Sequence, residues 1–439
     1  MDVLSFIECK RDGGAHSRED LEEFVRLFAS GRIPDYQAAA WLMSVYFKGL
    51  SEGELRDFTL ALADSGETLS FGPDIFLTDK HSTGGVGDKV TLILVPLAAA
   101  CGAPVAKLSG RGLGFTGGTA DKLEAIPGFR THLSGREFRD QVKTLGCAIS
   151  GHSADLAPAE AKFYALRDVT GTVPSLPLIC SSVVSKKLAG GADGFVFDVK
   201  CGRGAFMTDL DGARSLAKAL VSLSRSTGKK AVALITAMDQ PLGRWVGNAA
   251  EVLEAIEVLK GGGPEDVREV TLSLTGAMVS LARGVSLEEG RELAARRLDD
   301  GSGLAMMKKL VEAQRGDGRI CDFPGETLFI AKETFILKAP VSGEVEAADA
   351  RSIGEGVKRL GGGRMSLNEE IDLSVAVRLQ AKEGALVEEG DPLLEIRYTD
   401  KTRLKDALPF FEKAFSIRQE PMAKPVKDEK RGFILEVVQ

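Results

Sequence analysis

The chain has 439 residues, a formal net charge of −7 at pH 7 and a hydrophobic content of 44%. Its length predicts two or three domains, and its acidic balance argues against a protein that binds nucleic acid or an anionic membrane through clustered cations. The start of the chain lacks the apolar core of a signal peptide, and the six cysteines are scattered without a CxxC pair, so we expect a cytoplasmic protein without a zinc site or disulfides.

The first part of the chain, to about residue 65, predicts helices with apolar faces at helical spacing. Residues 17–20 (SRED) have the pattern of a capping box at the start of one helix, Pro34 opens a second, and residues 51–54 cap a third. These three segments predict a helical bundle.

From residue 75 the pattern changes to short apolar strands that alternate with helices and glycine loops. Residues 194–200 (GFVFDVK) and 230–238 (KAVALITAM) are two such strands, with an amphipathic helix between them. This alternation predicts a largely parallel sheet whose ligands lie at the carboxyl ends of the strands. Residues 158–190 are again helical in pattern, and we expect them to join the N-terminal bundle.

From about residue 330 the sequence shows period-two alternation and turn signals, which predict a small β-rich domain. The stretch 385–396 (ALVEEGDPLLEI) is similar to the barrel fold of biotinyl and lipoyl carriers. A carrier lysine in a hairpin is missing, so a structural role is favoured over a carrier role.

The first loop that carries chemistry is residues 80–89 (KHSTGGVGDK), between a predicted strand and a predicted helix. Backbone amides at a helix N-terminus, the hydroxyls of Ser82 and Thr83 and the ammonium of Lys80 suit a phosphate dianion. The loop is not a P-loop, because the GxxxxGK[ST] pattern is absent.

The second loop is residues 109–124 (SGRGLGFTGGTADKLE), which contains a GxGxxG pattern. That pattern alone is weak evidence for a dinucleotide site, and the preceding strand does not begin a clean βαβ unit. The hydroxyls of Ser109, Thr116 and Thr119 favour a small oxyanion instead.

The third segment runs from Arg167 to Lys187. If its second half is helical, Ser182 and Lys186 share one face, because they are four residues apart. With Arg167 nearby in space, they could hold a planar polar ring. Taken alone, the segment is more typical of a solvated helix with lysines.

Together these segments resemble the thymidine and pyrimidine-nucleoside phosphorylase family, closest to its bacterial pyrimidine-nucleoside branch. The resemblance extends over nearly the whole chain, and the motifs that carry it are KHSTGGVGDK, SGRGLGFTGGTADKLE, ALRDVTGTVPSLPLICSSVVSKK, DVKCGRGAFM and MDQPLGRWVGNAAEVLEAI. It implies an all-α domain on the pyrimidine side and an α/β domain on the phosphate side of a cleft. We therefore assign residues 1–68 and 158–190 to the all-α domain, 69–157 and 191–329 to the α/β domain, and 330–439 to a C-terminal α+β domain of barrel-sandwich type.

The resemblance also implies the functional residues. The positions that match the phosphate site and its surroundings are Lys80, His81, Ser82, Thr91, Lys107, Leu108, Ser109 and Thr119. Those that match the groups around the pyrimidine ring are Arg167, Ser182 and Lys186. Lys80, His81, Arg167 and Lys186 are the catalytic candidates, and His81 either acts directly on a carbonyl oxygen of the base or only orients the loop.

A structural potassium site is implied as well, held by backbone carbonyls and one carboxylate. The matching positions are Gly87, Lys89, Leu242 and Trp245 through their carbonyls and Glu254 through its side chain. Carbonyl ligation would tolerate side chains as unusual there as those of Lys89 and Trp245. The alternative for Glu254 is a surface charge on a helix.

The expected activity is reversible phosphorolysis of uridine, thymidine or deoxyuridine by a homodimer that uses inorganic phosphate and no organic cofactor. A thymidine-specific phosphorylase is the main alternative; an anthranilate phosphoribosyltransferase and a non-catalytic nucleoside-binding protein are further rivals. Two residues depart from the family pattern, because Phe115 stands where histidine is usual and Arg203 where a small residue is usual.

Overall fold

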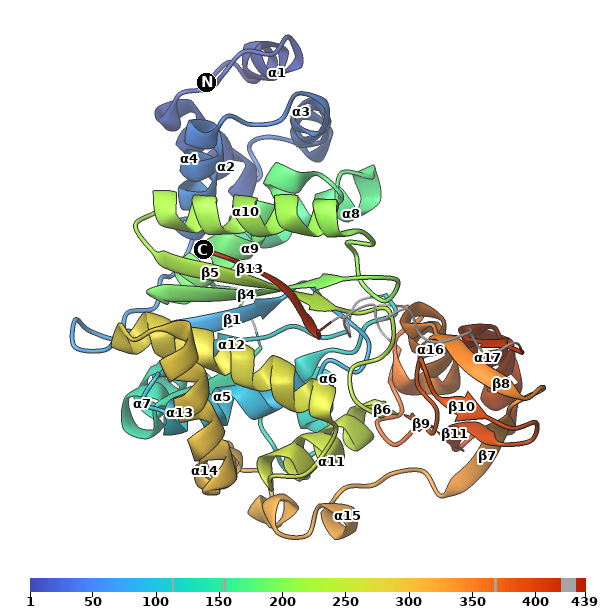
Figure 1. The fold of residues 1–439 in the computed structure, drawn as a ribbon. Helices are drawn as coiled ribbons and strands as arrows, with labels where there is room; N and C mark the ends of the chain where they lie inside the picture. The colour runs from blue at the N-terminus through green and yellow to red at the C-terminus, as the bar shows by residue number, and fades with distance from the viewer. Residues whose placement is uncertain (113, 152, 154, 367–368, 420–431) are drawn as a thin grey trace.

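The computed structural model describes residues 1–439 except 113, 152, 154, 367–368 and 420–431. Leu113, in the second glycine loop, is therefore outside the described residues. The chain forms a helical domain, an α/β domain and a small C-terminal domain with sheets; in Figure 1 the helical domain lies above the large sheet and the C-terminal domain to its right. The predicted fold class is confirmed, whereas the predicted domain boundaries stay predictions.

The helical domain combines two separate parts of the chain. Its helices are α1 (Val3–Arg11), α2 (Arg18–Ala29), α3 (Asp35–Lys48), α4 (Glu52–Ala63), α8 (Pro158–Thr170) and α9 (Leu176–Ala189). Ser51 and Glu54 form the capping box at the start of α4. Phe24, Trp41 and Phe163 pack in one aromatic core, which joins α8 to the N-terminal helices.

The described residues of the α/β domain form a six-stranded sheet in the order β13-β5-β4-β1-β2-β3. Its strands are β1 (Thr78–Ser82), β2 (Val105–Leu108), β3 (Cys147–Ser150), β4 (Gly194–Cys201), β5 (Lys230–Ala237) and β13 (Ile434–Val438). The first five are parallel, and β13 pairs antiparallel with β5. The end of the chain thus lies in this sheet, although residues 330–439 were predicted to form the C-terminal domain, because strand pairing between distant segments leaves no local sequence pattern.

Helices cover both faces of this sheet (Figure 1). One face packs against α5 (Val90–Ala100), α11 (Asn248–Leu259), α12 (Glu265–Arg283) and α14 (Ser302–Ala313), and the other against α7 (Gly135–Leu145), α9 and α10 (Leu210–Ser226). The remaining helices of this region are α6 (Thr119–Glu124) and α13 (Leu287–Asp299). Since all eight residues of β4 are buried, its polar side chains have to find partners inside the protein.

The C-terminal domain contains two small sheets. One has the order β10-β8-β12, with β10 (Leu386–Val387), β8 (Gly343–Ala348) and β12 (Phe415–Arg418). The other has the order β6-β9-β11-β7, with β6 (Trp245–Val246), β9 (Ala376–Leu379), β11 (Pro392–Tyr398) and β7 (Glu333–Lys338). The helices α16 (Ala350–Val357) and α17 (Lys401–Ala414) pack together beside them, and α15 (Pro324–Thr327) precedes them. Because β6 comes from the α/β part of the chain, the two domains share a sheet.

No single helix in the described residues is long and apolar enough to cross a membrane; the α12–α13 pair meets that test only when its two sharply bent halves are taken together.

Candidate active site

The predicted phosphate loop begins at the end of β1, and its lysine is buried. The Lys80 side chain has no exposed surface, and its Nζ lies 2.8 Å from Asp198 Oδ2 on β4 and 3.8 Å from Asp88 Oδ2. Lys200 contacts the same Asp198 oxygen at 3.0 Å. Although burial opposes the charge, the carboxylates of Asp198 and Asp88 raise the pKa of Lys80. Lys80 is therefore a fixed, charged ammonium in the interior of the domain.

A second lysine–aspartate contact lies on the neighbouring residues of β1 and β2. Asp79 accepts a hydrogen bond of 2.6 Å from Lys187 of α9 and lies 3.6 Å from the Nζ of Lys107. Lys107 also donates to the carbonyl oxygens of Lys80 (2.7 Å) and Leu108 (3.1 Å). Burial lowers the pKa of Lys107 to about 7, and Lys187 and Lys80 add to this effect. Lys107 therefore changes charge near neutral pH.

The hydroxyl groups of the first loop order the loop itself. Ser82 Oγ donates to Asp88 Oδ2 at 2.6 Å and accepts from the Gly84 amide at 3.3 Å. Burial alone would raise the pKa of the Asp88 carboxyl, but the ammonium groups of Lys200 and Lys80 outweigh this effect and lower the pKa. Thr83, which resemblance did not single out, accepts from the Lys200 amide at 2.9 Å. The Ser82–Asp88 hydrogen bond therefore orders the loop internally, and the Thr83 hydroxyl attaches it to β4.

The other predicted phosphate residues lie around the same strand ends. Thr91 is buried at the start of α5, Ser109 directly follows β2, and Thr119 is the first residue of α6. The Ser109 amide donates to the Ser150 carbonyl at 2.9 Å, which aligns the start of the second glycine loop with the end of β3. All these positions lie toward the carboxyl ends of parallel strands, the expected ligand edge of the sheet.

The predicted pyrimidine residues lie on α8 and α9. Arg167 is buried and donates to three carbonyl oxygens, those of Val173 (2.7 Å), Leu178 (2.9 Å) and Thr172 (3.4 Å). Burial lowers its pKa, but a guanidinium stays charged in proteins. A small pocket of the helical domain is lined by Leu42, Phe58, Leu62, Glu160, Phe163, Arg167, Leu178, Ser181 and Ser182.

Glu160 is a residue of this group that sequence reasoning missed. Its carboxylate accepts a hydrogen bond from Ser182 and lies 2.9 Å from the Nζ of Lys186. Lys186 also donates to Ser182 at 3.3 Å and lies 5.4 Å from the centroid of the Tyr164 ring. The (i, i+4) spacing of Glu160 and Tyr164 on α8 places both toward α9, but only the packing of the two helices reveals the contact.

His81 belongs to the phosphate group of predicted residues by its place on β1. Burial lowers the pKa of its imidazole well below the usual value, and the ammonium groups that add to this effect are those of Lys187, Lys107, Lys186 and Lys80. Lys186 belongs to the pyrimidine group and Lys80 to the phosphate group. His81 lies directly after Lys80 on β1, and among the described residues the pocket lined by Arg167 contains no residue of the first glycine loop.

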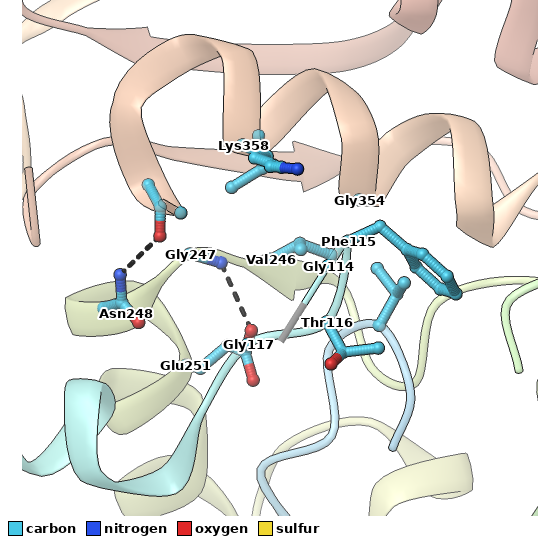
Figure 2. Close-up of a pocket in the computed structure, with 14 residues that line it drawn as sticks. Gly114, Phe115, Thr116, Gly117, Val246, Gly247, Asn248, Glu251, Gly354 and Lys358 are labelled. Carbon is cyan, nitrogen blue, oxygen red and sulfur yellow. Dashed lines mark hydrogen bonds between the residues drawn. The ribbon is translucent and has the colours of Figure 1, made fainter. Parts of the chain in front are cut away.

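A second pocket lies where the α/β domain meets the C-terminal domain (Figure 2). It is lined by Val86, residues 114–117, residues 246–248, Glu251, Gly354, Val357, Lys358, Gly362 and Gly363. Both departures from the family pattern lie at this boundary. The guanidinium of Arg351 on α16 lies 5.1 Å from the centroid of the Phe115 ring, and Arg203 Nε lies 3.6 Å from Asp349 Oδ2.

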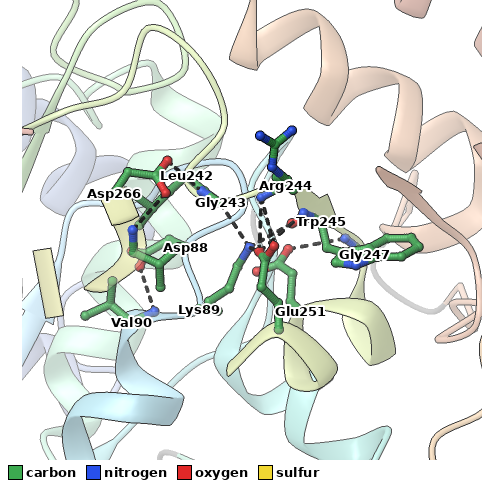
Figure 3. A network of polar contacts seen from close by, with 12 residues as sticks. Asp88, Lys89, Val90, Leu242, Gly243, Arg244, Trp245, Gly247, Glu251 and Asp266 are labelled. Atoms are coloured by element: carbon green, nitrogen blue, oxygen red, sulfur yellow. Dashed lines mark hydrogen bonds and ion pairs between the residues drawn. The ribbon is translucent and has the colours of Figure 1, made fainter. Parts of the chain in front are cut away.

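Of the five residues predicted to hold potassium, Leu242, Trp245 and Glu254 meet around the side chain of a fourth, Lys89 (Figure 3). The ammonium of Lys89 donates to the carbonyl oxygens of Leu242 (2.9 Å) and Trp245 (2.8 Å) and to the carboxylate of Glu254. The carbonyl of Gly87 accepts from the Lys89 amide at 2.9 Å, and that of Lys89 accepts from the Leu92 amide at 3.0 Å. The expectation that Lys89 contributes only its carbonyl is therefore wrong, because its side chain fills the place of the ion, and the residues present do not fit a potassium ion.

In the described residues no group of three or more histidines, cysteines and carboxylates is arranged to hold a metal.

Family models and similar proteins match this chain over most of its length, and they indicate the same family. Family models match residues 4–66 (glycosyl transferase family, helical bundle domain), 75–304 (glycosyl transferase family, a/b domain) and 344–418 (pyrimidine nucleoside phosphorylase C-terminal domain). A pyrimidine-nucleoside phosphorylase of Staphylococcus haemolyticus is 45% identical over 420 residues, which cover 95% of this chain and 96% of that protein. One from Geobacillus stearothermophilus is 44% identical over 427 residues, which cover 97% and 98%.

Among solved structures, the anthranilate phosphoribosyltransferase of Thermus thermophilus has a similar fold. The TM-score is 0.56 at 21% sequence identity, and the match covers 72% of this chain and all of that protein. At this identity the similarity concerns the fold alone.

Proposed function

The chain belongs to the pyrimidine-nucleoside phosphorylase family of glycosyltransferases, and from this premise we propose that it catalyses the reversible phosphorolysis of pyrimidine nucleosides. Phosphate displaces the base from C1′ of the sugar, and the products are the free base and ribose or deoxyribose 1-phosphate. The observation that carries the proposal is the buried ammonium of Lys80 between Asp198 and Asp88 at the end of β1, in a chain 44–45% identical to pyrimidine-nucleoside phosphorylases over nearly its whole length.

The phosphate side is the group of residues around β1. The bond that forms joins a phosphate oxygen to C1′, so phosphate needs fixed positive charge that does not neutralise it by proton transfer. The contacts of Lys80 support its role as this fixed charge, because Asp198 and Asp88 keep its ammonium charged and in place. Ser82, Thr91, Ser109 and Thr119 supply hydroxyls near the same strand ends. Such prearranged charges are usually the largest catalytic contribution.

The base side is the group on α8 and α9. When the C1′–N1 bond breaks, its electron pair goes to the pyrimidine, and the negative charge spreads onto the ring carbonyl oxygens. Arg167 and Lys186 would face this charge, and Ser182 would orient the ring. Glu160 holds Ser182 and Lys186 in one arrangement and is a positioning residue.

His81 acts in its neutral form. Burial and the surrounding lysines lower its pKa, so the imidazole carries no excess proton at neutral pH in the free protein. It can still donate one N–H hydrogen bond to a carbonyl oxygen of the base. The departing base takes up one proton at N1, and hydrogen phosphate loses one when its oxygen bonds to C1′, so the proton passes between them through solvent and His81 stays neutral.

The two groups lie on different domains, so we expect the helical and α/β domains to close over the substrates. Closure would bring phosphate to C1′ and exclude water, which would otherwise hydrolyse the nucleoside. We further propose that the protein is a homodimer, as the resemblance implies.

The test is release of free base in the presence of phosphate. The purified protein is incubated with uridine, thymidine or deoxyuridine, with and without phosphate, and base release is followed by ultraviolet absorbance and chromatography of the sugar phosphate. We expect release from all three only when phosphate is present. No release from any of them would refute the proposal.

Specificity is decided by the same assay. A broad pyrimidine phosphorylase should have kcat/KM values for uridine and thymidine within about tenfold of each other, whereas a pocket closed to the 2′-hydroxyl of uridine typically rejects it by about 10²-fold. A preference for thymidine of that size would favour the thymidine-specific alternative.

A further inference from the structure

Lys89 is a completely buried lysine that has no partner in the phosphate or pyrimidine groups. Its side chain has no exposed surface, and it lies directly before α5, which begins at Val90. Figure 3 shows it pointing from the end of the first glycine loop toward the segment that contains Leu242, Arg244 and Trp245. Burying an ammonium costs free energy unless every N–H donates a hydrogen bond. The acceptors around Lys89 Nζ therefore indicate what this side chain does.

The ammonium has three donors and meets three oxygen acceptors. Two are the carbonyls of Leu242 (2.9 Å) and Trp245 (2.8 Å), and the third is the carboxylate of Glu254 on α11. The same carboxylate accepts from the backbone amides of Arg244 (3.0 Å) and Trp245 (3.2 Å). We call these three oxygens the oxygen cage; carbonyl and carboxylate oxygens are also ligands that a monovalent cation can take in place of water.

The cage has no room for a second cation. A Cβ atom built on Gly243 would lie 2.7 Å from Lys89 Nζ and 2.2 Å from Glu254 Oε2, so the backbone already closes over the ammonium. Gly243 has a φ of +77°, a conformation that glycine adopts without strain. On the other side, a Cβ on Gly87 would lie 2.5 Å from the Leu242 carbonyl oxygen. A metal ion here would coincide with the ammonium and meet its like charge at close range.

We propose that the ammonium of Lys89 is a covalently attached substitute for the monovalent cation at this place, and that this protein does not require such a metal. The inference goes beyond the proposed reaction, since it concerns the folded chain with or without substrate. With the Lys89 ammonium in this place, the stability and activity of the protein do not depend on potassium.

Lys89 acts as a positioning residue through the first glycine loop. Its neighbour Asp88 contacts Lys80, and the Asp88 carbonyl accepts from Lys122 Nζ at 2.7 Å. Lys122 in turn pairs with Glu251 at 2.7 Å. Two buried lysines thus attach this loop to α11, and through Trp245 the contact reaches β6, which pairs with β9 of the C-terminal domain.

The first test uses the unchanged protein. Its thermal midpoint is measured in potassium chloride and in choline chloride at equal ionic strength, over a range of concentrations. We expect the two curves to coincide within about 1 °C, because a cation that does not bind gives no linkage stabilisation. A potassium-specific rise in the midpoint that saturates with concentration would overturn the proposal, whatever the variants do.

The second test opens the cage. Lys89→Ser removes the ammonium and leaves the carbonyls and Glu254, so in choline we expect a fall of roughly 5–10 °C in the midpoint, because Glu254 becomes an unpaired buried charge. Potassium should then restore about half of this loss or more, and a crystal of the variant grown with rubidium should show an anomalous peak between Leu242, Trp245 and Glu254. A folded Lys89→Ser protein without potassium-specific recovery would contradict the proposal.

Two controls separate a cation site from a general salt effect. Lys89→Met fills the space without a charge, and we expect it to be destabilised without recovery in potassium. Lys10→Ser breaks another buried pair, since Lys10 lies 2.6 Å from Glu54 in the helical domain. Its loss of stability should respond equally to potassium and choline; an equal potassium-specific recovery there would also contradict the assignment.

Discussion

The two groups of predicted catalytic residues hold their positive charges in different ways. Beside β1, lysines are buried against carboxylates: Lys80 and Lys200 share Asp198, and Lys187 and Lys107 share Asp79. On α8 and α9, Arg167 instead donates to backbone carbonyls, and the Lys186 side chain is 27% exposed.

The two groups therefore differ in how far their side chains can move when substrate binds. The β1 cluster is fixed by strands and by paired charges, so a substrate anion meets a rigid arrangement. The α8–α9 group rests on two helices that pack through Glu160, and its lysine still reaches solvent. We infer that phosphate binds to a preformed site, whereas the pyrimidine site is completed when the domains close.

The largest expected effect comes from Lys80→Met. Removing one fixed charge that faces the transition state typically costs about 3–4 kcal/mol, so kcat/KM for phosphate should fall roughly 10²- to 10³-fold. Steady-state kinetics with varied phosphate measure this. Lys200→Met is the matched control, because it removes the other ammonium from Asp198. Equal losses in both variants would mean that the aspartate pairing, and not phosphate contact, explains the effect.

On the pyrimidine side, Lys186→Met should lower kcat/KM for the nucleoside by about 10²-fold, since one cation facing the departing base is lost. KM for phosphate should stay the same, which kinetics with each substrate varied in turn will show. Lys162→Met serves as the control, because Lys162 lies on the neighbouring helix α8 and donates to the Phe28 carbonyl inside the helical domain. A parallel rise in KM for phosphate would contradict the division into two sites.

A smaller effect should follow pH through Lys107. Its pKa is lowered to about 7, so the folded protein loses this positive charge as pH rises through 7. KM for phosphate should therefore increase by about tenfold between pH 6.5 and 9, the size expected when a hydrogen bond to a charged group weakens. Lys107→Arg keeps the charge and should remove the increase. An unchanged profile in this variant would assign the titration to another group.

The smallest effect concerns the boundary with the C-terminal domain. Phe115→His replaces the ring that lies 5.1 Å from the Arg351 guanidinium. A cation–π contact of this kind contributes about 0.5–1 kcal/mol, so the free energy of unfolding should fall by about that amount. We expect kcat to change less than about threefold. Urea denaturation and kinetics measure both; a large rise in kcat with unchanged stability would show instead that Phe115 restrains domain closure.

Much of this protein could be predicted from local sequence patterns. Apolar periodicity and capping residues predict the helices and strands, and the glycine loops predict the ligand edge of the sheet, because these signals depend only on neighbouring residues. Contacts between distant segments leave no such signal. Glu160 was missed because its partners Ser182 and Lys186 lie on another helix, and β13 because its partner β5 is about 200 residues away.

Family, fold class and the residue types that the reaction needs can all be recognised from the order of the amino acids. How their charges are balanced emerges from the packed fold: it shows which aspartates pair with Lys80 and Lys107, and that Lys89 directs an ammonium, and not merely a carbonyl, into the predicted cation site. The reason is that a side chain's charge acts over short distances through space, and those distances are set by packing between elements that are far apart in the chain.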